Sequence, residues 1–115
     1  TPSFIEENPD IVSEVRSGVL SNDLNSYTQC RRVLASGVIE LIRPNPPICI
    51  PTLVMTCEND SGSTPAMANA IGEEIEGSEV IIVPTLKHLG LLEKPKVFID
   101  SLTVFLERHW HNLSL

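Results

Sequence analysis

Basic residues are few in this sequence, with 8 Lys and Arg against 15 Asp and Glu and a formal net charge of -7 over 115 residues. Nucleic-acid binding relies on clustered Lys and Arg that neutralise phosphates, and here only Arg31 and Arg32 are adjacent. No apolar run approaches the roughly 20 residues needed to cross a bilayer. These absences argue against nucleic-acid partners and against a membrane protein.

The sequence also lacks an initiator methionine and a signal peptide. It begins Thr1-Pro2-Ser3, with neither a basic segment nor an apolar stretch behind it. We therefore expect a fragment or a processed product. The three cysteines, at positions 30, 49 and 57, form an odd set without metal-ligand spacing, and we interpret them as reduced thiols of a cytoplasmic protein. The sequence predicts no metal and no cofactor.

A proline-rich segment at residues 43–51 divides the chain. Pro44, Pro46 and Pro47 rule out regular secondary structure there, because proline lacks a backbone donor and restricts the residue before it. The sequence thus predicts a linker at 43–51 between a first part, residues 1–42, and a second part, residues 52–115.

The first part is predicted to be helical, either lid-like or connecting, and its residues 1–7 are expected to be a connecting segment. Asn8 and Pro9 favour the start of one helix, with Asn8 as its cap, that ends near Ser21-Asn22. A second helix is predicted from Asp23 to Ser36, with Gly37 as its C-terminal cap.

The second part changes to a strand, helix, strand, helix pattern. Residues 53–57 form an apolar run interrupted only by Thr56, typical of a strand covered on both faces, and residues 80–83 are all β-branched. A helix is predicted from Thr64-Pro65 to Gly77, and the last helix from Lys94-Pro95. The stripe expected to face the core of the first of these helices is Met67, Ile71 and Ile75.

The predicted fold class is therefore α/β, a β-α-β-α unit preceded by a helical segment. Two parallel strands alone do not cover their faces and edges. We expect them to pair with a sheet outside this chain or with a second copy in a homo-oligomer such as a dimer.

Asp60 and His88 each follow one of the two predicted strands. The carboxyl ends of parallel strands lie at one edge of the sheet, where a carboxylate orients an imidazole and the imidazole acts as a base near its ordinary pKa. The plainer interpretations are a solvated turn aspartate and a loop histidine bonded to backbone. The spacing predicts that the two side chains meet.

Several segments together resemble the α/β-hydrolase family over residues 48–107. They are Ile50-Pro51-Thr52-Leu53-Val54, Glu58-Asn59-Asp60, Thr64-Pro65, His88, Glu93-Lys94-Pro95, Phe98 and Phe105-Leu106. The resemblance implies the C-terminal β-α-β-α portion of such a sheet, with Asp60 as the catalytic acid and His88 as the catalytic base. In this family the nucleophile precedes both along the chain.

No Gly-x-Ser-x-Gly nucleophile motif occurs in this chain, and Ser17-Gly18 and Ser36-Gly37 lack its first glycine. The resemblance therefore implies a fragment of a hydrolase that acts on an ester, lactone or similar carbonyl substrate with a nucleophile from outside this chain. We expect the chain to be inactive alone. The alternative is a non-catalytic module of the same fold that self-associates or binds a small ligand.

Four other patterns have a functional interpretation beside a plainer one. Glu58 and Glu93 suit an acid–base pair, residues 61–64 precede a helix and suit an anion, Cys57 suits a thiol nucleophile, and His109 with His111 suits a metal. The plainer interpretations are preferred. They are two structural carboxylates, of which Glu93 bonds backbone donors at the start of the last helix, a flexible loop ending in a cap, a buried cysteine and the fraying end of a helix.

Overall fold

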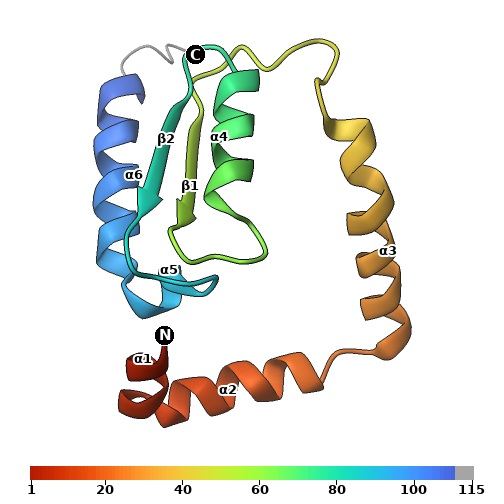
Figure 1. Cartoon of the computed structure of the whole chain (residues 1–115), viewed down its shortest axis with the longest axis vertical. Helices are drawn as coiled ribbons and strands as arrows, with labels where there is room; N and C mark the ends of the chain where they lie inside the picture. Colours follow the sequence, from red (N-terminus) through yellow and green to blue (C-terminus); the bar gives the residue numbers. More distant parts are fainter. Residues whose placement is uncertain (111–115) are drawn as a thin grey trace. The chain divides into compact units, whose positions relative to one another are not determined.

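The computed structural model describes residues 1–110, apart from the side chains of residues 40, 41 and 110 (Figure 1). The chain divides into two compact units, Thr1–Pro46 and the residues from Pro47 onward. The division falls within the proline-rich segment predicted as a linker.

The first unit contains three helices, α1 (Pro2–Glu7), α2 (Pro9–Leu20) and α3 (Leu24–Leu41). The segment predicted as a connection is thus largely helical, because the Thr1 hydroxyl accepts a hydrogen bond from Phe4 N and caps α1. Helix α2 begins at Pro9 with Asn8 at its N-cap position, as predicted, but the Asn8 side chain makes no capping hydrogen bond. The side-chain amide of Asn8 instead donates to Phe4 O at 3.2 Å, the carbonyl that also accepts from Asn8 N at the end of α1.

Helix α3 begins as predicted, with the Asp23 carboxylate accepting from Ser26 N at 2.8 Å. Its predicted end was wrong, because the helix continues through Gly37 to Leu41. Gly37 lies inside the helix, where glycine is tolerated at a modest cost in stability. The helix ends shortly before Pro44, because proline disfavours right-handed helical geometry at the residue before it. That residue, Arg43, has a φ of 55°.

The second unit contains β1 (Leu53–Cys57), α4 (Pro65–Glu74), β2 (Glu79–Val83), α5 (Gly90–Glu93) and α6 (Pro95–Trp110). The two strands are parallel and pair in register from Leu53 with Glu79 to Cys57 with Val83. Helix α4 lies on one face of this sheet and α6 on the other (Figure 1). The order of strands and long helices is as predicted, whereas the single turn α5 was not predicted because four residues carry no periodic signal.

The core of the second unit lies at the carboxyl ends of both strands. It consists of buried Cys57, Val83 and Leu86, against which Met55, Ile81 and Phe98 pack. Leu86 is 1% exposed although it lies in the loop after β2. The base of that loop is therefore held by the core, which matters for the residues that follow it.

The predicted core stripe of α4 is only partly correct. Ile75 and Ala68 are buried, but Met67 and Ile71 are about half exposed. A two-stranded sheet offers a narrow surface, and the helix approaches it through its small residues. The larger apolar side chains are left at the flank, where more sheet would be needed to cover them.

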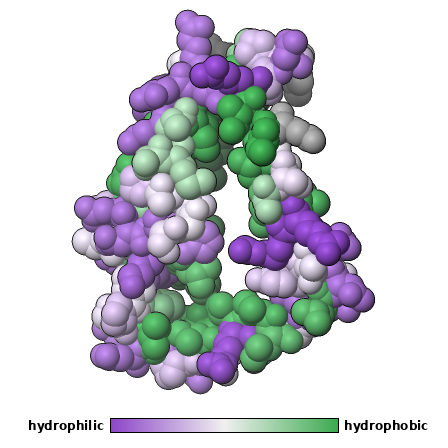
Figure 2. Space-filling view, turned by 45° about the vertical axis from the view of Figure 1, so that its right-hand side comes forward, coloured by the Kyte–Doolittle hydropathy of each residue, from purple (hydrophilic) through white to green (hydrophobic). Residues whose placement is uncertain are grey.

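Many other large apolar side chains are exposed in both units. Hydrophobic residues gather over α2, at the bottom of Figure 2. Exposed apolar residues of α2 and α3 help to line a cavity of about 280 Å³, namely Val19, Leu20, Leu24 and Tyr27. In the second unit, Val97, Ile99, Leu102, Val104 and Leu106 of α6 are each at least 40% exposed. Across the described helices, none is both long and apolar enough to cross a membrane.

Candidate acid–base site

The loop after β1 folds around the carboxylate of Asp60. Asp60 N donates to Cys57 O at 3.1 Å, which turns the chain at the end of the strand. Asp60 Oδ1 then accepts from Gly62 N at 2.8 Å and from Ser63 N at 2.9 Å. An aspartate that bonds to backbone two residues onward forms a turn of its own. We did not predict this turn, although an aspartate followed by serine and glycine is a signal for it.

His88 and Asp60 meet at the carboxyl ends of the strands, as their spacing predicted. His88 Nδ1 lies 2.8 Å from Asp60 Oδ2. The Asp60 side chain is 5% exposed, whereas the His88 side chain is 66% exposed. Asp60 is therefore not a solvated turn residue, and His88 is bonded to a carboxylate rather than only to backbone.

The surroundings of Asp60 keep its carboxyl ionised. The hydrogen bond from Ser63 N is the largest cause that lowers the pKa of Asp60, and the bonds from His88 and Gly62 N act in the same direction against the cost of burial. An ionised carboxylate only accepts hydrogen bonds. His88 Nδ1 therefore carries the proton in this contact, and Nε2 is left as the basic nitrogen.

The two loops that carry this pair are bonded to each other. Glu58 N donates to Val83 O at 2.8 Å, and Asn59 N donates to Leu86 O at 3.0 Å. The Glu58 carboxylate also accepts from Thr85 N at 2.7 Å. Glu58 thus has a structural task, as its plainer interpretation held, and that task is a bond to backbone that the sequence did not predict. Glu93 lies in the single turn of α5.

Two N–H groups in residues 61–64 donate to a carboxylate of this chain. Gly62 N and Ser63 N are directed at Asp60, and the Thr64 hydroxyl accepts from Met67 N at 3.3 Å to cap α4. The Thr56 hydroxyl donates to Ser63 O and holds the loop against β1. The segment therefore has the expected cap, and the amide groups of Gly62 and Ser63 serve the chain's own carboxylate in place of an external anion.

The Cys57 thiol is part of the core. Cys57 is 4% exposed, and burial is the main cause that raises its pKa, with the negative charge of Asp60 acting in the same direction. The protonated thiol is a poor nucleophile. The structure thus favours the buried structural cysteine over the thiol nucleophile. Cys30 and Cys49 are free and exposed.

The serines considered as remnants of a nucleophile motif lie in helices. Ser17 is in α2, and Ser36 is in α3 with its hydroxyl donating to Arg32 O at 2.9 Å. A serine that bonds back to the preceding helical turn is typical of ordinary helix interiors. Neither residue occupies a strand-to-helix turn of the kind that the nucleophile motif requires.

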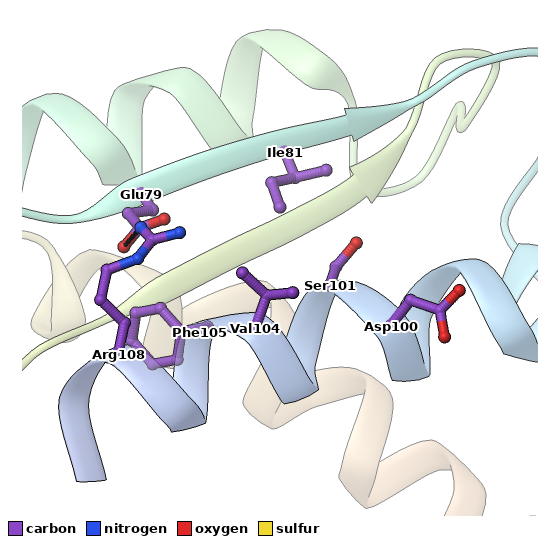
Figure 3. A pocket seen from close by; sticks show the side chains of 7 residues that line it. All are labelled: Glu79, Ile81, Asp100, Ser101, Val104, Phe105 and Arg108. Atoms are coloured by element: carbon purple, nitrogen blue, oxygen red, sulfur yellow. Dashed lines mark hydrogen bonds and ion pairs between the residues drawn. The ribbon is translucent and has the colours of Figure 1, made fainter. Parts of the chain in front are cut away.

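A second cavity, of about 310 Å³, lies between β2 and α6. Figure 3 shows Glu79 and Ile81 on the strand facing Asp100, Ser101, Val104, Phe105 and Arg108 on the helix. Arg108 donates to Glu79 at 2.6 Å, and His109 Nε2 lies 3.2 Å from the same oxygen. His109 is thus engaged by a carboxylate, and His111 lies outside the described residues. Among the side chains that the structure describes, no group of three His, Cys, Asp or Glu residues is placed to hold a metal ion.

Comparison with known proteins gives one distant similarity. The chain is 28% identical over 109 residues to 3-oxoadipate enol-lactonase 2 of Acinetobacter baylyi, an α/β-hydrolase. The matched region covers 94% of this chain and 39% of that protein. No protein-family model matches the chain, and no solved structure matches it with significance. The similarity and the partial α/β fold are consistent with a fragment of an α/β-hydrolase.

Proposed function

We propose that this chain supplies the acid and the base of a hydrolase whose nucleophile lies outside it. The observation that carries the proposal is the contact between His88 and Asp60. A buried, ionised carboxylate bonds Nδ1 of an exposed imidazole at the carboxyl ends of two adjacent parallel strands. This is the relation that a catalytic acid and base have to each other in nucleophile-His-acid hydrolases.

The reaction would be acyl transfer to a nucleophile and then to water. His88 Nε2 accepts the proton of the nucleophile as its oxygen or sulfur attacks the substrate carbonyl, and the same nitrogen then protonates the leaving oxygen. Water attacks the acyl group in the second half, with its proton passing through Nε2. Asp60 orients the ring and stabilises the imidazolium that forms in each half. The exposed ring of His88 leaves Nε2 available to a group that arrives from outside the chain.

For the substrate, we propose an ester or a lactone. The name of the similar Acinetobacter protein states an enol-lactone of 3-oxoadipate. An enol-lactone is a cyclic ester, and its carbonyl carbon takes the same nucleophilic attack as an open ester. A simple activated ester therefore suffices to test the chemistry.

The proposed partner is the rest of the sheet. Thr52 O accepts from Glu79 N, and Glu58 N donates to Val83 O, so the even-numbered residues of this stretch face β2. The alternating peptide groups, at Leu53 and Met55, face the opposite edge of β1. Within residues 1–110 no third strand pairs with that edge. An open edge of this kind accepts another strand.

The test measures hydrolysis of p-nitrophenyl acetate by the chain alone, by the chain with a complementing part, and by the His88→Ala variant with the same part. We expect no hydrolysis above background by the chain alone. Adding the part of 3-oxoadipate enol-lactonase 2 that lies outside the matched region should restore hydrolysis, and His88→Ala should abolish it. Hydrolysis by the isolated chain that His88→Ala removes would contradict an external nucleophile. Restored hydrolysis that persists in the His88→Ala variant would contradict the role of His88 as the base.

A second candidate is a non-catalytic module that self-associates. The open edge of β1 and the exposed apolar residues of α6 favour it, because two copies would cover both. Gel filtration separates the candidates when the complementing part is present. A module of this kind stays a homo-oligomer and gives no hydrolysis, whereas a hydrolase fragment moves into the mixed complex.

A further inference from the structure

The loop between β2 and His88 has an unusual backbone at Thr85. Thr85 has a φ of 66°, and Leu86 N donates to Pro84 O at 2.9 Å, so three residues close a γ-turn around it. A β-branched residue at positive φ is a genuine outlier that persists only where its surroundings hold it. Strained turns of this kind gather at functional sites.

The Glu58 carboxylate holds this turn from the facing loop. Its Oε2 accepts from Thr85 N at 2.7 Å across a separation of 27 residues. A backbone N–H bonded to a charged carboxylate forms a shorter and stronger hydrogen bond than one bonded to a neutral acceptor. The contact joins the first turn of the histidine loop to the loop of Asp60.

Three consecutive residues of one loop thus bind three points of the other. Glu58 binds Thr85, Asn59 N donates to Leu86 O, and Asp60 binds His88. Leu86 is fixed in the core. The path from Thr85 to His88 is therefore set at its start by Glu58 and at its end by Asp60.

We propose that Glu58 is a positioning residue for His88, acting through the Thr85 turn. The importance of Glu58 for catalysis rests on the proposed acid–base function, whereas its effect on the position of His88 does not. The effect on the His88–Asp60 contact is measured without turnover, so a failure of this inference is distinguishable from a failure of the proposed function.

The experiment measures the Nδ1 proton of His88 by NMR in the 115-residue chain with ¹⁵N-labelled histidine. Glu58→Ala should speed the exchange of this proton with water by about tenfold and shift the ring nitrogens toward the other tautomer. Glu58→Gln keeps an oxygen that accepts from Thr85 N and should stay near the original exchange rate. Glu76→Ala, which removes another exposed glutamate, should leave both signals unchanged.

Thr85→Gly gives a second measurement, because glycine adopts positive φ without strain. In that background Glu58→Ala should speed proton exchange much less than it does beside Thr85. If Glu58→Ala prevents folding by itself, a double variant that Thr85→Gly restores to the folded state with slow exchange supports the proposal, and a double variant that stays unfolded contradicts it. Unchanged exchange in folded Glu58→Ala, or an equal change in Glu76→Ala, would overturn the proposal.

Discussion

His88 Nδ1 and Asp60 Oδ2 lie 2.8 Å apart although 28 positions separate the two residues. The contact follows from the pairing of β1 with β2, which ends with Cys57 beside Val83 and releases both loops at the same edge of the sheet. One member of the pair is almost fully buried and the other is largely exposed. The carboxylate is thus held by the chain, while the imidazole remains open to an external group.

Asp60→Asn should abolish most catalysis while leaving the loop folded. The asparagine Oδ1 can still accept from Gly62 N and Ser63 N, but its amide donates to His88 Nδ1 where a carboxylate accepted. The proton then moves to Nε2 and the base is lost. We expect kcat of the complemented enzyme on p-nitrophenyl acetate to fall by about four orders of magnitude.

The matched control for that variant is Asp100→Asn. Asp100 is an exposed aspartate whose ion pair with Lys96 lies within one turn of α6. Such pairs contribute little to stability and none to this site, so kcat should be unchanged. Full activity of Asp60→Asn would contradict the role of the acid.

The stability of the chain should fall in acid partly because of Asp60. Its pKa is lowered below the ordinary value of 3.8 in the folded protein, chiefly by Ser63 N. The unfolded chain therefore binds the proton first as pH falls. The stabilisation is present above pH 3.8 and is lost as pH falls through the folded pKa. Urea unfolding over this pH range should show that the free energy of unfolding falls less steeply with pH in Asp60→Asn than in the original chain.

Glu79 offers a contrast in the same experiment. His109 first and then Arg108 lower the pKa of Glu79 below its ordinary value of 4.5. Stability therefore depends on pH in the same direction as for Asp60, and the stabilisation is lost as pH falls through the pKa of Glu79 in the folded chain. This partly exposed cluster is screened by salt, whereas backbone hydrogen bonds to a buried carboxylate are screened much less. Added NaCl should thus remove the effect of Glu79→Gln and preserve that of Asp60→Asn.

The sequence predicted those parts of the fold that local signals determine. Runs of β-branched and apolar residues located both strands, and Thr64-Pro65 and Pro95 located the starts of two helices. The order of acid and histidine after parallel strands predicted that Asp60 and His88 meet. These features depend on propensities and on chain order, which are visible without tertiary contacts.

Other features depend on packing that one sequence does not display. Gly37 indicates a helix end, but the helix ends only at the proline-rich segment. The helical spacing of Met67 and Ile71 predicts that they are buried in the core, but in this chain the sheet is too narrow to cover them. The Glu58–Thr85 contact joins residues far apart in sequence. It also needs a positive φ at Thr85, a conformation that a threonine in a sequence does not predict.

Gly90→Ala should destabilise the second unit by about 1–3 kcal/mol, because a methyl group there would overlap the Cys57 sulfur and approach the Leu86 Cβ to 3.0 Å. Adding Cys57→Ala should recover part of the loss by removing the sulfur. The control is Gly18→Ala, which meets nothing within 4 Å in the interior of α2 and should stabilise by about 0.5–1 kcal/mol. Urea unfolding measures all three, and a Gly90→Ala chain as stable as the original would refute the tight contact.

The open edge of β1 should make the isolated chain self-associate. Leu53 directs its N–H away from β2, so Leu53→Pro removes a donor from the open edge only, at a strand's first residue, where proline is tolerated. Val54 directs its N–H toward β2, so Val54→Pro breaks the existing ladder. By sedimentation we expect the original chain to form dimers or larger species as concentration rises, and Leu53→Pro to remain a folded monomer.

Val54→Pro is the control for that comparison, and it should lose the strand pairing altogether, as seen by circular dichroism. Exposed peptide groups next to apolar side chains favour strand addition, and removing one outward donor weakens that addition without affecting the pairing of β1 with β2. A monomer at all concentrations would show that the edge of β1 does not recruit a second strand. Association that persists unchanged in Leu53→Pro would place the contact on the apolar helices, where the exposed side of α6 is the alternative surface.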